Sequence, residues 1–318
     1  MIAVYIIAGI LVLFVIPHFL VTYIIFHEFF GRMSQEKIDK RVRTNPNYEK
    51  CVNEMFLEAD RLRQDCQELD ITSIDGLKLH GYYFDKGNDK IVMMFHGVHA
   101  NSLFHFSIQA RECLKRGYNV LIVDERAHSK SEGKYITYGV KEHKDVLSWI
   151  DHVSNNFKEK EIYLYGLSMG ATSICLASQN LDNLKIKAMV IDSAFINIGE
   201  LVNNIVARGN IPKPLFIGGV KFLAKHLAGI DFNSFDTREA LKNTKIPALF
   251  VQGTNDIVVS KQFLIDNYNN CVSSKEILEV EGVGHTLAIP LGGEEAVDKL
   301  FNFLRSQSKD EQEICNYA

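Results

Sequence analysis

The chain has 318 residues, of which 47% are hydrophobic and 23% charged, and its formal net charge is −4. This composition is typical of a folded globular protein, and the chain lacks the basic excess that a nucleic-acid-binding protein needs, so no nucleic-acid partner is expected. The six cysteines are scattered without a Cys-x-x-Cys pair, which predicts neither a zinc site nor a disulfide framework.

The first 30 residues are predicted to form a membrane anchor. Ile2 to Phe26 is almost wholly apolar and carries no charged side chain apart from the titratable His18. About 25 residues at about 1.5 Å each reach roughly 37 Å as a helix, which is enough to cross a bilayer core. A cleaved signal peptide fits less well, because no basic n-region precedes the apolar run and no small-x-small cleavage site follows it.

Basic residues follow this segment instead of preceding it. They are Arg32, Lys37, Lys40, Arg41 and Arg43. The positive-inside rule therefore predicts a single-pass protein of the cell membrane with the rest of the chain in the cytoplasm. Residues 31–67 are charged and helix-prone, with Asn45-Pro46 as a cap and first-turn proline, and are predicted to be a helical connector.

From residue 68 to residue 308 the apolar segments alternate between strand and helix patterns. Leu69–Ile74 and Leu77–Phe84 are predicted to pair as a hairpin around Asp75-Gly76. Further strands are predicted at Ile91–Phe95, Asn119–Val123, Glu161–Tyr165, Ala188–Ile191, Ala248–Val251 and Glu276–Val280. Helices are predicted at Ser102–Lys115, Lys141–Phe157 and Ala171–Ser178, between the last two strands, and from Glu294. This alternation predicts an α/β fold with a mostly parallel central sheet flanked by helices, followed by a tail at 309–318.

One stretch breaks the alternation. Residues 195–236 are too many for a crossover loop and contain two apolar helical runs around Ile211-Pro-Lys-Pro214. They are predicted to form a small helical cap above the carboxyl ends of the strands, where ligands bind in open α/β sheets.

Ser168 is the candidate nucleophile. It lies in Gly166-Leu-Ser-Met-Gly170, which fits a nucleophile elbow, a sharp strand-to-helix turn whose flanking positions need glycine. The bare pentapeptide is a weak signal, but here a predicted strand precedes it and a helix of small residues follows, which is the expected setting.

A serine hydroxyl needs a neighbouring base, and His285 and Asp256 are the candidate partners. Each follows a predicted strand, and they occur in the order serine, acid, histidine that this elbow uses. His285 would take the serine proton, and Asp256 would hold its tautomer and stabilise the imidazolium. Asp192, after the preceding predicted strand, is the alternative acid.

Two backbone N–H groups are expected to form the oxyanion hole. One belongs to Met169, the residue after the nucleophile, and the other to Val98 in the loop after Ile91–Phe95. In the same loop, His99 is interpreted as a polar loop residue without a catalytic part.

These segments together resemble the α/β-hydrolase superfamily, and within it the bacterial serine aminopeptidase-like and prolyl-oligopeptidase-like branch with an N-terminal membrane segment. The resemblance runs from about Leu69 to Leu304 and includes Phe95-His-Gly, Asp124-Glu-Arg-Ala-His-Ser-Lys-Ser-Glu-Gly and Gly284-His285. Ala127 and Ser129 depart from it, since the family usually has glycine at both positions. The resemblance implies a serine hydrolase without metal or organic cofactor.

The apolar cap predicts the substrate class. Its many aliphatic and aromatic residues can line an acyl pocket, which predicts a carboxylic-ester hydrolase for an apolar, lipid-like or other small-molecule ester. A peptidase or acyltransferase could use the same triad, and a membrane-tethered binding protein without activity is a further alternative. The sequence does not predict the oligomeric state.

Overall fold

The structure is a computed structural model that describes residues 1–318 except 2–4, 6–10, 182–183, 209–212 and 309–318. The predicted tail at 309–318 and residues 2–4 and 6–10 of the predicted anchor lie outside the described residues.

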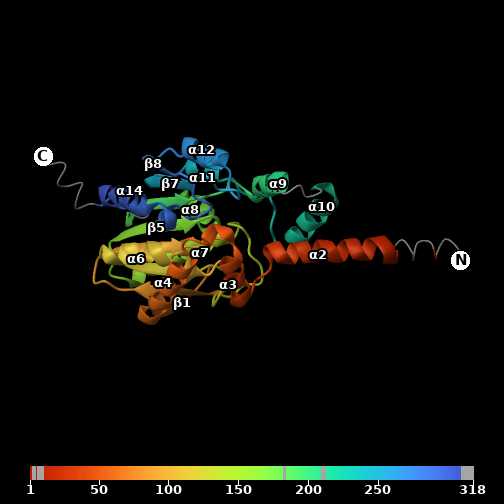
Figure 1. Ribbon diagram of the computed structural model, residues 1–318, viewed down its shortest axis with the longest axis horizontal. Coiled ribbons are helices and arrows are strands. Elements are labelled where there is room, and N and C mark those ends of the chain that lie inside the picture. Colours follow the sequence, from red (N-terminus) through yellow and green to blue (C-terminus); the bar gives the residue numbers. More distant parts are fainter. Residues whose placement is uncertain (2–4, 6–10, 182–183, 209–212, 309–318) are drawn as a thin grey trace.

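A twisted sheet of eight strands forms the centre of the described domain (Figure 1). In chain order they are β1 (Gln67–Thr72), β2 (Lys78–Phe84), β3 (Lys90–Phe95), β4 (Asn119–Asp124), β5 (Glu161–Leu167), β6 (Ile186–Asp192), β7 (Ala248–Gly253) and β8 (Lys275–Val280). The strand order is β1-β2-β4-β3-β5-β6-β7-β8. The strand β2 is antiparallel to both of its neighbours, β1 and β4, and the six strands from β3 to β8 are parallel to one another. The predicted α/β class with a mostly parallel sheet is confirmed.

Helices cover both faces of this sheet. They are α3 (Gln35–Thr44), α4 (Val52–Asp65), α5 (Ser102–His105), α6 (Ser107–Lys115), α7 (Glu142–Asn156), α8 (Met169–Ser178), α11 (Thr237–Leu241), α12 (Lys261–Asn270), α13 (Ala288–Leu291) and α14 (Gly293–Ser306), with the short helix η2 (Pro46–Tyr48). The predicted helix Ser102–Lys115 is divided, because Phe106 leaves helical geometry at φ −101° and ψ 5°.

The alternation along β3 shows how the core is divided. Val92 and Met94 face a core completed by α4, α6 and α14, whereas Ile91, Met93 and Phe95 face one completed by α7, α8 and α12. Side chains of successive strand residues point to opposite faces, so a strand buried on both faces is apolar throughout. The two cores hold the carboxyl ends of the parallel strands, and the loops that follow them, in fixed positions.

The N-terminal helix and the predicted cap lie together at one side of the domain. After η1 (Leu11–Val15), the helix α2 (Ile16–Phe30) projects outward, and α10 (Lys213–Leu223) packs along it (Figure 1). The segment predicted as a cap also contains α9 (Ile198–Arg208) and η3 (Ala224–Ala228). Within the described part of the chain, no helix is both long enough and apolar enough to span a bilayer, so the predicted transmembrane anchor is not supported.

Candidate active site

Ser168 stands at the sharp turn between β5 and α8. Its backbone has φ 52° and ψ −109°, a strained conformation for a residue with a side chain, and its N–H donates to the carbonyl oxygen of Asp192 at 2.8 Å. The glycines around it have a steric reason. A Cβ on Gly170 would lie 1.9 Å from the carbonyl oxygen of Phe95, and one on Gly166 would lie 2.4 Å from the backbone of Ala171.

His285 and Asp256 meet on the loops that follow β8 and β7. The Nδ1–H of His285 donates to Oδ2 of Asp256 at 2.7 Å. The other carboxylate oxygen of Asp256 accepts from the backbone N–H groups of Val258 and Val259 at 2.8 and 2.9 Å. The carboxylate is thus fixed from both sides, and it fixes the orientation of the imidazole ring.

The charges of this pair stabilise each other. Burial lowers the pKa of His285, but the negative charge and hydrogen bond of Asp256 outweigh it, so the pKa lies above 6.5. Burial raises the pKa of Asp256, but the charge of His285 and the donated hydrogen bonds bring it below 3.8. Asp256 is therefore ionised at neutral pH and favours a proton on its partner.

Asp192, the alternative acid, has a different environment. Its Oδ1 accepts from the hydroxyl of Ser193 at 2.9 Å, and its Oδ2 has no hydrogen-bond partner among the described residues. Burial raises the pKa of Asp192 to about 7. The carboxyl group in contact with His285 is that of Asp256.

Ser168 and His285 open on one cavity of about 260 Å³. Val98 lines it too, whereas Met169 is buried at the first position of α8. The first N–H groups of a helix have no partner inside the helix, so the N–H of Met169 is available as a donor. The other lining residues are mainly aromatic or aliphatic, and they include Tyr138, Leu167, Phe195, Leu201, Ile205 and Val258.

Buried histidines hold the loop that carries Val98. Nε2 of His96 accepts from the backbone N–H of Glu125 at 2.9 Å, and its Nδ1–H donates to the carbonyl of Gly97 at 2.7 Å. Nε2 of His128 accepts from the backbone N–H of His99 at 2.9 Å. Burial lowers the pKa of His96 to about 3, so this imidazole is neutral and can accept a hydrogen bond.

The loop after β4 keeps a glycine-like backbone at two positions that lack glycine. Ala127 and Ser129, which replace the glycines usual in the resembling family, have φ values of 61° and 40°. Both lie in the left-handed region, where a Cβ is unfavourable. The surrounding contacts hold this conformation, since the N–H of Ala127 donates to the carbonyl of Glu132 at 2.8 Å.

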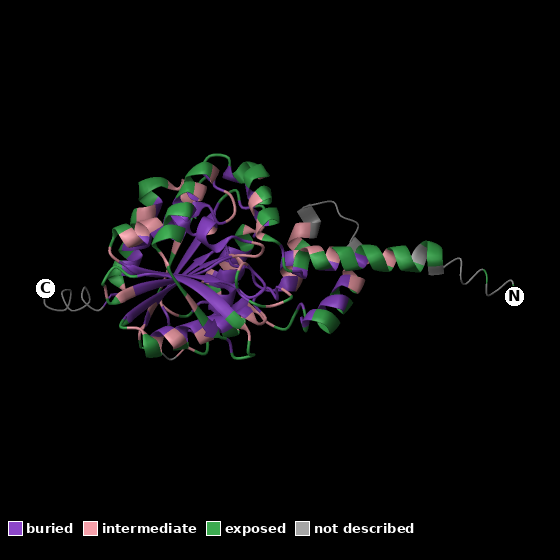
Figure 2. Ribbon diagram, turned by 90° about the horizontal axis from the view of Figure 1, so that it is seen from below, coloured by how far each residue is buried: buried purple, intermediate pink, exposed green. Residues whose placement is uncertain are grey.

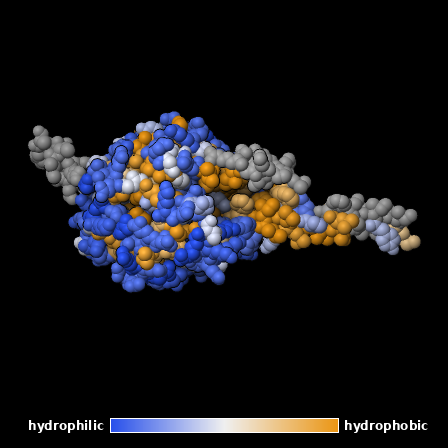
Figure 3. Space-filling view, in the orientation of Figure 1, coloured by the Kyte–Doolittle hydropathy of each residue, from blue (hydrophilic) through white to orange (hydrophobic). Residues whose placement is uncertain are grey.

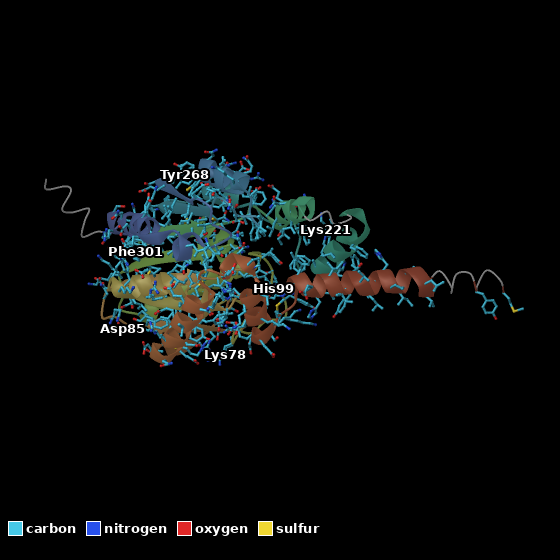
Figure 4. The ribbon with its side chains drawn as sticks, in the orientation of Figure 1. Lys78, Asp85, His99, Lys221, Tyr268 and Phe301 are labelled. Atoms are coloured by element: carbon cyan, nitrogen blue, oxygen red, sulfur yellow. The ribbon has the colours of Figure 1, made fainter. Side chains whose placement is uncertain are left out.

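Two site features were missed by sequence reasoning. Tyr48, from the predicted connector, lines the cavity together with Thr286. His99, interpreted as a plain loop residue, lies at the base of α2, where its Nε2–H donates to the carbonyl of Gly31 at 3.1 Å (Figure 4). Each feature brings together segments that are far apart in the sequence, and no local sequence pattern indicates either of them.

Comparison with known sequences points to a hydrolase family. The family model "Serine aminopeptidase, S33" matches residues 86–216, which include Ser168 but neither Asp256 nor His285. An uncharacterized protein of Salmonella typhimurium, YfhR, is 23% identical over 215 residues, which cover 62% of this chain and 67% of that protein.

Solved structures with the same fold include two esterases. The Pyrococcus furiosus esterase Pf2001 has 27% identity and a TM-score of 0.64, over 78% of this chain and 95% of that chain. The esterase EaEST from Exiguobacterium antarcticum has 20% identity and a TM-score of 0.56, over 74% of this chain and 98% of that chain. The chain thus has the α/β-hydrolase fold, and the comparisons support a hydrolase of this superfamily.

Proposed function

We propose that the chain is a serine hydrolase that cleaves carboxylic esters with an apolar acyl group. The observation that carries the proposal is the hydrogen bond between His285 and Asp256 beside the cavity that Ser168 lines. A strained serine, an oriented imidazole and a buried carboxylate are the three parts that nucleophilic acyl transfer needs.

The proton moves along a defined path. Because Nδ1 of His285 carries a proton donated to Asp256, Nε2 is the basic nitrogen and takes the proton of the Ser168 hydroxyl as its oxygen attacks the ester carbonyl. The tetrahedral intermediate collapses, the imidazolium protonates the departing alcohol, and an acyl-enzyme forms. Water, deprotonated by the same nitrogen, then releases the acid and restores the serine.

The negative oxygen of each intermediate needs two donors. In the proposal these are the N–H groups of Met169 and Val98, as expected from the sequence. The hydrogen bonds of His96 and His128 hold the Val98 loop in place before the reaction, so its donor need not reorganise during the reaction.

The cavity favours an ester with an apolar acyl group over a substrate with a free amine. None of the described side chains that line the cavity is an aspartate or a glutamate, so an α-amino group would find no counter-charge there. The name of the solved esterase Pf2001 points the same way. A peptidase and an acyltransferase are the alternatives that the same triad allows.

Labelling with a fluorophosphonate tests the proposal. The wild type should be labelled and Ser168→Ala should not, and a folded wild type that stays unlabelled would favour a non-catalytic binding protein. A p-nitrophenyl ester series should show higher kcat/KM for medium acyl chains than for acetyl. Faster cleavage of aminoacyl arylamides, or transfer to an added alcohol in preference to water, would support the peptidase or the acyltransferase instead.

A cytoplasmic location at the cell membrane is a second part of the proposal. Its support is the group of basic residues between Arg32 and Arg43, after the apolar N-terminal segment. A reporter fused after Ala318 should be active only in the cytoplasm, and activity of a reporter that works only outside would overturn this location.

A further inference from the structure

An unusually apolar surface lies on α2 and the cap. Phe19, Leu20 and Ile24 on α2 are 54%, 53% and 64% exposed, and Phe222 and Leu227 on α10 and η3 are 59% and 44% exposed. We call these five side chains the α2–cap surface. Figure 3 shows its apolar colour beside the hydrophilic domain, and Figure 2 shows how exposed α2 is. Exposed apolar patches of this kind usually mark an interaction site.

The two helices that carry this surface pack as one unit. A Cβ on Gly219 of α10 would lie 2.6 Å from Cγ2 of Thr22, so the glycine allows α10 to lie directly against α2. His18 and Phe216 stack with ring centroids 5.0 Å apart. A partner that covers α2 therefore meets the cap as well.

The exposure of α2 indicates a partner that covers more than one face of the helix. Successive helix residues point about 100° apart, so Phe19, Leu20 and Val21, each at least 41% exposed, face three different directions. A folded protein partner, or a second copy of this chain, would cover one stripe and leave the others in water. Lipid acyl chains cover all of them.

The charges around this surface are complementary to anionic headgroups. The sequence has no aspartate or glutamate in residues 1–27 or 201–230, whereas the second stretch contains Lys221 and Lys225, both exposed. Lys221 lies on α10 (Figure 4), directly before Phe222 in the sequence. Cations at the edge of an apolar surface favour an anionic bilayer and oppose the pairing of two identical surfaces.

We infer that the α2–cap surface binds a lipid bilayer with anionic headgroups, and that the cap itself is part of the membrane contact. One apolar cluster continues from this region to the active site. It contains Phe26 and Phe30 of α2 together with Phe195 and Leu201, which line the cavity. If the proposed esterase activity is correct, the bilayer lies next to the cavity and supplies acyl esters to it. The binding itself does not depend on that activity.

Vesicle partitioning of the full chain tests the inference. The protein is transferred by dilution from detergent into vesicles of phosphatidylcholine with phosphatidylglycerol, and partition constants are obtained by flotation. Phe222→Ser/Leu227→Ser should weaken partitioning about tenfold or more, because two large apolar side chains no longer leave water. Vesicles of phosphatidylcholine alone should bind the wild type more weakly.

Matched controls separate the possible causes. Leu184→Ser/Val272→Ser changes two side chains that are 87% and 66% exposed elsewhere on the domain, and it should partition like the wild type. Ser168→Ala should also partition normally, so a failure of the esterase proposal is distinguishable from a failure of this one. Unchanged partitioning of the cap variant, or a lipid-free dimer in light scattering that the cap variant dissociates, would overturn the inference.

Discussion

Two aspartates near His285 allow a paired test of the proposed triad. Asp256→Asn and Asp192→Asn make the same chemical change, a carboxyl group to an amide of equal size. Only Asp256 accepts the hydrogen bond from His285, at 2.7 Å, whereas Asp192 bonds Ser193 and keeps one oxygen unpartnered among the described residues. The proposal therefore predicts that the two variants differ greatly.

The size of the difference follows from the hydrogen bonds. In Asp256→Asn the amide oxygen keeps the N–H groups of Val258 and Val259, which leaves the NH₂ group facing Nδ1 of His285. The imidazole must then accept at Nδ1 and carry its proton on Nε2, where it can no longer act as the base. The expected loss in kcat is about ten-thousandfold, or about 5.4 kcal/mol. Asp192→Asn should lose less than about tenfold, since the Asp192 side chain hydrogen-bonds Ser193, whereas His285 bonds Asp256.

Both variants are assayed with a soluble p-nitrophenyl ester across pH and with fluorophosphonate labelling. In the wild type, kcat/KM should fall as the pH is lowered and His285 becomes protonated. The midpoint of this fall should lie above pH 6.5, because Asp256 raises the pKa of His285. The residual activity of Asp256→Asn should have this acid limb at lower pH. Circular dichroism checks that each variant is folded. Equal losses, or a larger loss for Asp192→Asn, would refute the assignment of Asp256.

Three further predictions concern the surroundings of the triad. Gly170→Ala should lower the free energy of unfolding by about 1–3 kcal/mol and abolish labelling of the serine, because the added Cβ would lie 1.9 Å from the carbonyl oxygen of Phe95; urea unfolding measures the first effect. Asp192→Asn should raise the free energy of unfolding at pH 8 by at most about 4 kcal/mol, and should not raise it at pH 4. Burial raises the pKa of Asp192 to about 7, so the wild type loses stability as the pH rises from about 4 to 7 and this buried group ionises. His99→Ala should lower kcat about tenfold with little change in KM, and His99→Gln should recover part of it, because the bond to the carbonyl at the end of α2 positions the loop.

The sheet and the loops after its strands could be predicted because their signals are local. Buried parallel strands are short apolar runs, and Glu161–Tyr165 before Gly166 and Ala188–Ile191 before Asp192 are of this kind. Once β7 and β8 are placed in parallel next to β6, the loops after them lie on the same edge as Ser168. The meeting of His285 with Asp256 then follows from topology, although the choice between two aspartates needed the hydrogen bonds.

The contributions of the N-terminal part could not be predicted, because they depend on tertiary contacts. Asn45-Pro46 indicates a helix start but not that Tyr48 packs against Phe104, with ring centroids 5.7 Å apart, and lines the cavity. The apolar composition of Ile2 to Phe26 indicates a membrane segment but not that Thr22 packs on Gly219. A hydrophobic run does not indicate which of its side chains a neighbouring helix covers.

The end of α2 is joined directly to the loops of the active site. Gly31 pairs with Tyr135 as an isolated bridge, and its carbonyl accepts from His99, the residue after the proposed oxyanion donor Val98. Arg32 donates to the carbonyl of Ser131 at 2.6 Å, in the loop that also holds His128. A change in the direction of α2 would therefore move Gly31 and, through its hydrogen bond to His99, the loop that carries Val98. The segment that the sequence suggests is a separable anchor is thus a structural support of the candidate active site, and what its apolar surface contacts bears directly on the geometry around Ser168.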